Sequence, residues 1–586
     1  MKSHSKFRLK VSGITSRIIL TLLLGIIFFP AHTYAAIYYV DYNSGLDSNP
    51  GTSKAAPWKR APGMKGFTGS YTHAAGDKII FKGGVTWPSA VLPITIKEGW
   101  DGTAANWDYH GIDSTWFSGT VFNRPKFDGQ RLIGIIMSLS YTNNALIDGI
   151  EFTGSVTKDG TGESTISAYD PGAVTFNNLY IHNWDKNATT DNGGGGGIYI
   201  SYLRHRGEVT VQNSILNNQD GRQNHPGYMV GGCLRGVDNV INCELAYAIQ
   251  GLLHGGKTFA YNHVHHISSK FYDPAAHDNT AYLDSDPLYQ TNGRYPSIQV
   301  YGNHFHDLNC STGAVYINPK GNDYFYVYNN LFINVNDVAN ILVDTYMGTG
   351  EVYIWNNTFY ISDQVDVVRG GISGGGRVAT KKLVVQNNHI MSDKSGSGID
   401  NTNVTTFIAD HNLKQTMAVA SAAGYTAAKN YSPVASSSPT VNAGTTIISA
   451  ICNKITVDYN GVARAQGGIW DIGAYEFGGT IDSQAPTAPA NLVSSNVVQT
   501  GFTLSWTAST DNTGVTGYEV FRGTTSCGTT AATTMSIAGL TCNTTYSMTV
   551  KARDASGNWS VASTAKSVTT SACTGDTCLL YTSRCV

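Results

Sequence analysis

The sequence predicts an all-β protein, in which a right-handed parallel β-helix solenoid is followed by a small β-sandwich. Three observations lead to this fold class. Charged residues make up only 14% of the 586 residues and Gly occurs 64 times, which suits short strands joined by tight turns. An Asn-centred apolar segment recurs along most of the chain, as expected for a solenoid. The Pro-rich stretch from Asp482 to Pro489 then separates this repeat from a second group of strand-like segments.

The first 35 residues read as a signal peptide rather than as part of the fold. Lys2, Arg8 and Lys10 belong to a basic stretch, and the apolar run from Ile18 to Phe29 is too short for an ordinary membrane span. Small residues near Ala35 then provide a cleavage site. We therefore expect a secreted or cell-surface protein without a membrane span.

The repeat defines the coils of the solenoid. Each copy places β-branched or aromatic residues at alternating positions around an Asn, so that one side chain of every pair points into a shared core. A single coil cannot bury its apolar face, and coils must therefore stack. The Asn is expected at a turn with left-handed backbone geometry, where stacked amides can also hydrogen-bond from coil to coil. The anchors are Asn178, Asn213, Asn242, Asn262, Asn303, Asn330, Asn357 and Asn388.

Both ends of the repeat region resemble a known group of proteins. Asp41, Gly45, Asp47 and Trp58 look like the N-terminal entry of secreted pectate-lyase-like β-helix proteins, and Asp471-Ile-Gly-Ala-Tyr-Glu-Phe477 resembles their closing motif. The resemblance implies a β-helix domain over residues 36–478. It leaves the reaction open, because this group includes lyases, hydrolases, epimerases and adhesins.

After a linker at residues 479–489, the segment 490–570 is similar to a fibronectin type III domain. Trp506 is expected in its core, and Tyr546, which follows Leu540, is expected to form a tyrosine corner. Residues 571–586 form an irregular tail whose end reads as sequence foreign to the protein.

The nine cysteines allow two bridges in an oxidising compartment. Cys233 and Cys243 are close enough in the chain to pair, although buried free thiols explain them equally well. Cys527 and Cys542 are a candidate bridge within the sandwich.

Aligning the Asn anchors brings four histidines together. His263 and His265 fall on the coil next to His304 and His306, at equivalent positions that face the same side. Such a patch suits metal binding or proton transfer, while the alternative is a stacked polar ladder facing solvent. Glu244 falls in an apparent core column, and the short interval after Asn242 favours a local shift of this coil over a buried carboxylate.

Long loops of a solenoid commonly form its binding face, and two loops here are rich in charge. The candidate catalytic groups are Lys270, His277, His265 and Arg222. The candidate substrate-binding groups are Arg204, Arg206, His263, His304 and His306. Asp278, Asp284 and Asp286 are candidate ligands of Ca²⁺, the cofactor that this set of oxygen donors suggests. Any one of these residues taken alone is also consistent with an ordinary polar loop position.

These groups are those required to cleave an acidic polysaccharide by β-elimination. A cation neutralises the uronate carboxylate, and a base removes the C5 proton. The sequence therefore favours a polysaccharide lyase, with a glycoside hydrolase or a non-catalytic carbohydrate-binding adhesin as alternatives. The net charge of −2 gives no reason to expect nucleic acid as a partner, and we expect a monomer that meets a polysaccharide substrate.

Overall fold

A computed structural model was obtained for the chain. It describes residues 35–158, 163–187, 196–200, 207–219, 228–232, 238–248, 250–252, 257–267, 279–284, 297–309, 312–319, 323–335, 339–344, 350–361, 366–370, 379–396, 398–449, 452–465, 468–478, 484–511, 514–523, 525–554 and 558–573.

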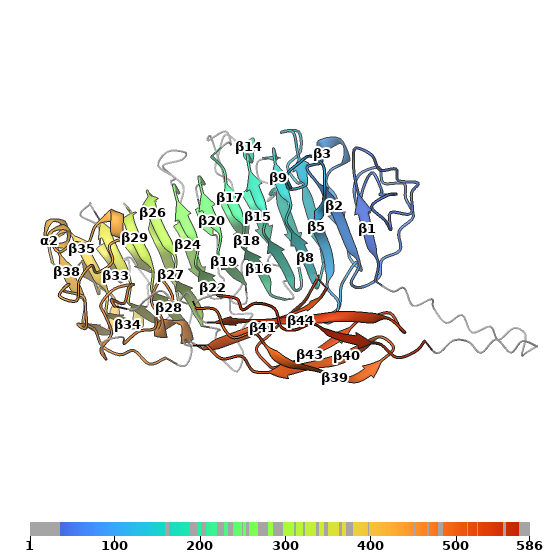
Figure 1. Ribbon diagram of the computed structural model, residues 1–586. Helices are drawn as coiled ribbons and strands as arrows, with labels where there is room; N and C mark the ends of the chain where they lie inside the picture. Colours follow the sequence, from blue (N-terminus) through green and yellow to red (C-terminus); the bar gives the residue numbers. More distant parts are fainter. Residues whose placement is uncertain are drawn as a thin grey trace, which may run out of the picture.

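Three long parallel sheets wrap around one core and form a β-helix (Figure 1). Each full coil contributes one strand to each sheet, and every strand pairs with the equivalent strands of the coils before and after it. The predicted fold class is confirmed by this strand pairing. We call the sheets A, B and C.

Sheet A has the following strands: β1 Ile37–Val40, β2 Lys78–Gly83, β5 Asp108–Phe117, β8 Ala145–Asp148, β12 Val174–Asn177, β16 Val209–Gln212, β19 Asn239–Ile241, β22 Thr258–Ala260, β25 Ile298–Tyr301, β28 Tyr324–Tyr328, β31 Glu351–Trp355, β34 Thr380–Gln386 and β37 Val404–Asp410. Sheet B has β4 Ile94–Ile96, β7 Met137–Ser140, β11 Ile166–Tyr169, β15 Gly196–Ile200, β18 Tyr228–Gly232, β21 Gln250–Leu252, β24 Asn279–Asp284, β27 Gly313–Asn318, β30 Ala339–Val343, β33 Asp366–Gly370 and β36 Ile399–Asp400.

Sheet C has β3 Thr86–Pro88, β6 Lys126–Asp128, β9 Glu151–Thr153, β13 Tyr180–His182, β17 Ile215–Asn217, β20 Glu244–Ala246, β23 His263–His265, β26 His304–Leu308, β29 Leu331–Val335, β32 Thr358–Ile361, β35 His389–Ser392 and β38 Leu413–Gln415. The short strands β10 Val156–Lys158 and β14 Asp185–Asn187 pair with each other, and single helical turns occur at η1 Ser89–Val91, η3 Ala427–Lys429 and η4 Asn453–Thr456.

Each coil passes from sheet A to sheet C through one residue with a left-handed backbone. Gly and Asn tolerate a positive φ best, which explains why Asn is frequent here. At Gly302, where φ is +67°, a Cβ atom would also lie 2.7 Å from the ring of Tyr261. In successive coils this turn position is held by Asn178, Asn213, Asn242, Tyr261, Gly302, Asn329, Asn356, Asn387 and His411.

The residue after this turn points into the solenoid, where a second column of Asn side chains is buried. Asn303 Nδ2 donates to Asn330 Oδ1 at 2.9 Å, and Asn330 Nδ2 donates to Asn357 Oδ1 at the same distance. The complete ladder consists of Asn262, Asn303, Asn330, Asn357, Asn388 and Asn412. The predicted hydrogen-bonded stack is confirmed for these residues.

The sequence alignment placed all eight Asn anchors at one equivalent position, and this alignment is wrong by one residue in three coils. Asn178, Asn213 and Asn242 hold the left-handed turn instead of the buried ladder. The physical reason is that Asn suits both places, as a residue that tolerates positive φ and as an amide that can donate and accept inside a core.

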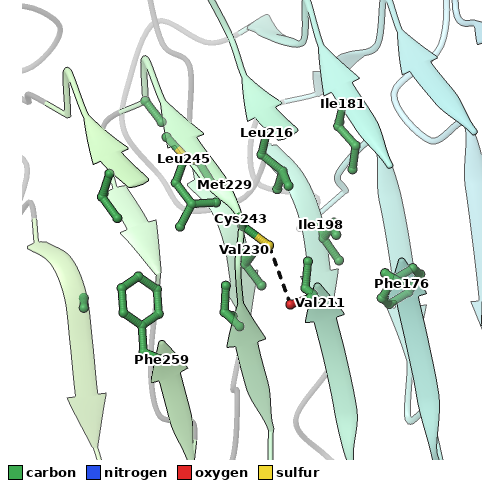
Figure 2. Close-up of a cluster of buried hydrophobic side chains, with 14 of the residues drawn as sticks. Phe176, Ile181, Ile198, Val211, Leu216, Met229, Val230, Cys243, Leu245 and Phe259 are labelled. Atoms are coloured by element: carbon green, nitrogen blue, oxygen red, sulfur yellow. Dashed lines mark hydrogen bonds between the residues drawn. The ribbon is translucent and has the colours of Figure 1, made fainter. Parts of the chain in front are cut away.

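Apart from the Asn ladder and other buried polar side chains, the solenoid core is apolar, and it contains a free thiol. Figure 2 shows aliphatic and aromatic side chains of neighbouring coils meeting around Cys243, whose Sγ lies 3.6 Å from the carbonyl oxygen of Val211. Cys243 is free and 2% exposed, and burial raises its pKa to about 12. Of the two interpretations left open, the buried thiol is therefore the one observed for Cys243, whereas Cys233 lies outside the described residues.

The chain after β38 returns over the outside of the solenoid. The helix α2 (Met417–Ala422) and Tyr425 pack with Met391 over sheet C, and Ile447 and Trp470 pack with Tyr328 and Trp355 over sheet A. The return segment thereby covers the outer faces of these two sheets in the last coils.

The closing motif at residues 471–477 anchors this return segment through a buried cation. The Arg464 side chain is 0% exposed and its Nη1 lies 3.5 Å from Glu476 Oε2. Asp471 Oδ1 accepts a hydrogen bond from the amide of Asn442. Arg464 Nη2 also donates to Asn329 Oδ1 at 2.7 Å, which ties the closing motif to the turn column.

The C-terminal sandwich consists of two antiparallel sheets. One contains β39 Ala490–Val498, β40 Gly501–Thr507 and β43 Thr534–Ala538, and the other β42 Thr525–Thr530, β41 Val515–Arg522, β44 Thr545–Asp554 and β45 Lys566–Thr569. Trp506 is buried in its core, and the amide of Thr541 donates to Tyr546 Oη at 2.8 Å, so both features predicted for this domain are confirmed. The sandwich lies beside sheet A in Figure 1.

The disulfide of the sandwich joins Cys542 to Cys573, and Cys527 is free. The predicted Cys527–Cys542 bridge is therefore wrong. The amide of Asn543 donates to the carbonyl oxygen of Ser571, which holds the segment after β43 against the chain that follows β45. This pairing brings Cys542 next to Cys573. Among the described residues, no helix has the length and apolar character needed to cross a bilayer.

Candidate functional sites

The four aligned histidines form one patch on the outer face of sheet C. His263 pairs with His304 and His265 with His306, so the predicted equivalence of the two coils is confirmed. Val264 and Phe305, which lie between them in the sequence, point into the core and are fully buried. The parallel register thus places imidazoles of neighbouring coils side by side, with ring centroids of His265 and His306 5.0 Å apart.

Hydrogen bonds link these imidazoles to each other and to one carboxylate. His263 Nε2 lies 2.7 Å from His306 Nε2, and His306 Nδ1 lies 2.7 Å from Asp307 Oδ2. His265 Nδ1 lies 2.8 Å from His266 Nδ1. Asp307 Oδ2 accepts a hydrogen bond from His306 Nδ1, so a neutral His306 directs the lone pair of its Nε2 at His263.

The electrostatics of the patch favours neutral imidazoles. Burial, followed by the charges of neighbouring histidines, lowers the pKa of His265 to about 3 and of His304 to about 4. Burial and His306 also lower the pKa of His263. These three side chains therefore carry free lone pairs at neutral pH, as a proton acceptor or a metal ligand requires.

Glu244 belongs to this outer column and not to the core. It pairs with His263 in register, accepts a hydrogen bond from Asn217 Nδ2 at 2.8 Å and lies 3.6 Å from His265 Nε2. The shifted coil favoured by the sequence is thereby confirmed. The shift follows from the one-residue difference between Asn242, which is a turn residue, and Asn262, which is a ladder residue.

A second group of polar side chains lies on the outer face of sheet B. The rings of Tyr282 and Tyr316 are stacked with centroids 4.8 Å apart and an interplanar angle of 13°. Asn318 Nδ2 donates to Tyr282 Oη at 3.2 Å, and Tyr316 Oη donates to Asp344 Oδ2. The pairing of Asp284 with Asn318 brings the ends of β24 and β27 together at this place.

One buried oxygen in this group has no hydrogen bond. Asn318 is 6% exposed, and its Oδ1 accepts no hydrogen bond from the part of the chain that the structure describes. A buried amide oxygen without a donor is costly, and a cation is one partner that would satisfy it.

Most of the predicted loop residues lie outside the described residues. These are Arg204, Arg206, Arg222, Lys270, His277, Asp278 and Asp286, while Asp284 is described in its backbone only, as the last residue of β24. The described part of the predicted site thus comprises His263, His265, His304 and His306. These histidines lie on sheet C, whereas β24, the strand next to the loop at 270–278, belongs to sheet B.

Sequence reasoning missed the tyrosine pair and the role of Asp307 next to His306. The signal for the tyrosines was the pair of matching segments Ala281-Tyr-Leu-Asp284 and Val315-Tyr-Ile-Asn318, which are in register on sheet B. An alignment anchored on Asn finds sheets A and C, because the Asn turn lies between them, and it leaves the strands of sheet B unaligned.

Comparison with known proteins identifies the C-terminal module. The family model of the fibronectin type III domain matches residues 487–566. The chain is 57% identical to Chitinase A1 of Niallia circulans over 91 residues, which are 16% of this chain and 13% of that protein. It is 51% identical to Exoglucanase B of Cellulomonas fimi over 98 residues, 17% of this chain and 9% of that protein. The chain therefore spans only a small fraction of the length of these curated relatives.

Two solved structures are similar over the β-helix. Pectate lyase Pel9A is 15% identical, with a TM-score of 0.36 over 76% of this chain and 97% of that chain. The PL6 family alginate lyase AlyGC is 12% identical, with a TM-score of 0.32 over 68% of this chain and 58% of that chain.

Proposed function

We propose that the protein is an extracellular polysaccharide lyase that binds a uronate-containing polysaccharide along the outer face of sheet B and cleaves it by β-elimination. The observation that carries this proposal is the stacked pair Tyr282 and Tyr316 with its polar partners Asn318 and Asp344. Aromatic faces pack against the apolar faces of sugars, and the hydroxyl, amide and carboxylate groups beside them pair with sugar hydroxyls.

The charged candidates lie next to the strands of this sheet in the sequence. Arg204 and Arg206 follow β15, Arg222 precedes β18, and Lys270 and His277 precede β24. In a parallel sheet, the starts of all strands lie along one edge and their ends along the other. In the sequence, the candidate cations and bases therefore adjoin strands of the sheet on which we propose that the polysaccharide binds.

One described residue, Asn318 at the end of β27, fits an oxygen-bound cation, because its Oδ1 accepts no hydrogen bond from the described residues. Together with the candidate ligands Asp278, Asp284 and Asp286, it would provide the type of oxygen donors that Ca²⁺ takes. When bound, Ca²⁺ would neutralise the uronate carboxylate and so acidify the C5 proton.

The protein's own residues would supply the remaining steps. Lys270 or His277 would remove the C5 proton, the electron pair would form the C4–C5 double bond, the bond from C4 to the glycosidic oxygen would break, and the leaving oxygen would take up a proton from solvent. Arg204, Arg206 and Arg222 pair with uronate carboxylates of neighbouring sugars through charge-assisted hydrogen bonds. Secretion is proposed on the signal-like first 35 residues.

Incubation of the purified chain with pectate, alginate and glycosaminoglycans, with Ca²⁺ or with a chelator, tests the proposal. We expect ultraviolet absorbance from an unsaturated uronate end on at least one substrate, dependent on Ca²⁺. The double variant Tyr282→Ala/Tyr316→Ala should lose substrate binding. The matched control is Tyr180→Ala, which removes an outward tyrosine that is stacked on His182 of sheet C and should leave turnover unchanged.

Other results would replace this proposal with one of the two alternatives. New reducing ends without unsaturation indicate a hydrolase. Glycan binding that persists in Lys270→Ala/His277→Ala, with no turnover by the unaltered chain on any polyuronate, indicates a binding protein.

A further inference from the structure

We propose that His263, His304 and His306 on sheet C form a binding site for a divalent transition metal ion, with Zn²⁺ as the ion to test. This site is separate from the proposed polysaccharide face and does not depend on it, because it lies on another sheet and uses nitrogen donors. Neither strand pairing nor core packing requires three imidazoles at these outward positions.

The three imidazoles converge. One ring nitrogen of each lies within 4.8 Å of the others, and within the described residues this is the one group of three potential ligands found at such a spacing. Zn–N bonds of about 2.0–2.1 Å in a tetrahedral site place two nitrogens roughly 3.3 Å apart. The 2.7 Å contact between His263 Nε2 and His306 Nε2 would open by a fraction of an ångström to admit the ion.

Asp307 provides the support that metal-bound histidines commonly have. Metal-binding imidazoles usually donate their second ring N–H to a carboxylate or carbonyl, which fixes the tautomer and orients the ring. His306 Nδ1 makes this contact with Asp307 Oδ2 at 2.7 Å, so His306 Nε2 is left as the ligand atom. The alternative from the sequence, a stacked polar ladder facing solvent, would not require the contact between His306 Nδ1 and Asp307 Oδ2.

The donor set selects the class of metal. Three neutral imidazoles suit Zn²⁺, Cu²⁺ or Ni²⁺, whereas Ca²⁺ and Mg²⁺ take oxygen donors. His263 is exposed, so the site opens to solvent on one side.

The local fold explains why the patch is held in place. On the side of β29, Leu331 and Ile333 are packed under Ala474 and Tyr475 of the return segment, next to β26, which carries His304 and His306. On the other side, Glu244 pairs with His263. The imidazoles thus lie between a covered apolar surface and a carboxylate, which limits their freedom before any ion binds.

Calorimetric titration of Zn²⁺ into the full chain, purified without a His tag and stripped with a chelator, tests the site. We expect one ion per chain and binding too weak to detect in His304→Ala and in His306→Ala. Asp307→Asn should bind about 10- to 100-fold more weakly, because it alters the second contact of His306. The matched control is His411→Ala, since His411 is also exposed and has a neighbouring carboxylate at 2.8 Å, Asp410 Oδ1, but lies at the turn after β37, outside the histidine patch.

Two further measurements keep the result interpretable. The visible absorption of Co²⁺ in place of Zn²⁺ should show a low-coordinate nitrogen site in the unaltered chain and none in His304→Ala. Circular dichroism of each metal-free variant should match the unaltered chain, so that lost binding is not lost folding. Full Zn²⁺ binding in both His304→Ala and His306→Ala, Ca²⁺ binding of equal affinity that is lost in His304→Ala, or no Zn²⁺ binding by the unaltered chain would each overturn the proposal.

Discussion

At the scale of single residues, Asn shows how one side chain serves two positions in the same coil. In the turn column it is selected for its backbone, whether the side chain is exposed, as at Asn242 with φ +54°, or buried, as at Asn356 with φ +51°. In the ladder it is buried and selected for its amide, as at Asn330, which is 0% exposed. Loss of a ladder Asn side chain should reduce the free energy of unfolding more than loss of an exposed turn Asn side chain, because an unsatisfied buried donor or acceptor costs far more than an exposed one.

The variant Asn330→Ala tests this difference. It removes the acceptor of two hydrogen bonds from Asn303 and the donor of bonds to Val300, Tyr328 and Asn357. With several buried groups unpaired, we expect the free energy of unfolding to fall by about 3–6 kcal/mol. Urea denaturation measures the change. The control Asn242→Gly keeps the positive φ and should change stability by less than about 1 kcal/mol, and an equal loss in both variants would contradict the argument.

At the scale of elements, the return segment is held by charge as well as by apolar packing. Arg464 is fully buried among Asp458, Asp471 and Glu476, and these carboxylates also accept backbone hydrogen bonds within residues 442–477. This arrangement explains the presence of Asp471 and Glu476 in the closing motif, since both carboxylates lie around the buried Arg464. Removing one partner of such a network leaves the other charges buried without compensation.

We therefore expect Arg464→Met to weaken the closing segment. The loss should be about 3–5 kcal/mol, and limited proteolysis followed by mass spectrometry should find new cleavage between residues 416 and 478. Arg369→Met is the control, because the ion pair of Arg369 with Asp400 is 3.9 Å long and more than a third exposed on the arginine side. Such a pair contributes less than about 1 kcal/mol. Cleavage that is the same in both variants would show that Arg464 does not hold this segment.

The sequence predicted the coils, the facing histidines and the core of the sandwich, because each depends on local alternation or on one large buried side chain. The histidines aligned correctly since Asn262 and Asn303 are both ladder residues. The alignment failed before Asn262, where the anchors are turn residues, and no local pattern separates the two roles. The disulfide was missed because the partner of Cys542 is set by how β43 and the end of β45 approach in space.

At the scale of the whole molecule, stability should depend on pH through the histidines whose pKa is lowered, which are those of the patch on sheet C and two fully buried histidines near opposite ends of the solenoid. Burial lowers the pKa of His110 and of His389 to about 4 from an ordinary value of 6.5. Between these values the unfolded chain binds more protons than the folded chain, so stability falls as pH falls from 6.5 towards 4. Each histidine contributes about 3 kcal/mol to this loss, and above pH 6.5 neither has an effect.

Replacing one of them tests this pH dependence. His389→Leu removes a titrating group of the core while keeping apolar volume, so the decrease in thermal midpoint between neutral and acid pH should be smaller than in the unaltered chain. His411→Ala removes an exposed histidine and should leave the decrease unchanged. Identical pH profiles for His389→Leu and the unaltered chain would show that His389 is not held neutral in the fold.

The three faces of the solenoid serve different purposes. The return segment packs on sheet A in the last coils, and burial together with Arg522 of the sandwich lowers the pKa of Lys78 at the other end of the same sheet. Figure 1 shows the sandwich along this side. Sheets B and C carry the two candidate sites, each built from outward side chains of parallel strands.

Both candidate sites lie on the same two adjacent coils. His263 and Tyr282 belong to one coil, and His304 and Tyr316 to the next. In evolution, one deletion or duplication within this pair of coils would therefore change both sites together. An in-frame deletion of one coil length, such as residues 262–302, would put Asn303 in the place of Asn262 and would remove His263 from the metal site and Tyr282 from the tyrosine pair at once. Duplication of the same stretch would extend both sites together. We therefore expect related proteins to gain or lose the metal-binding histidines and the stacked tyrosines together.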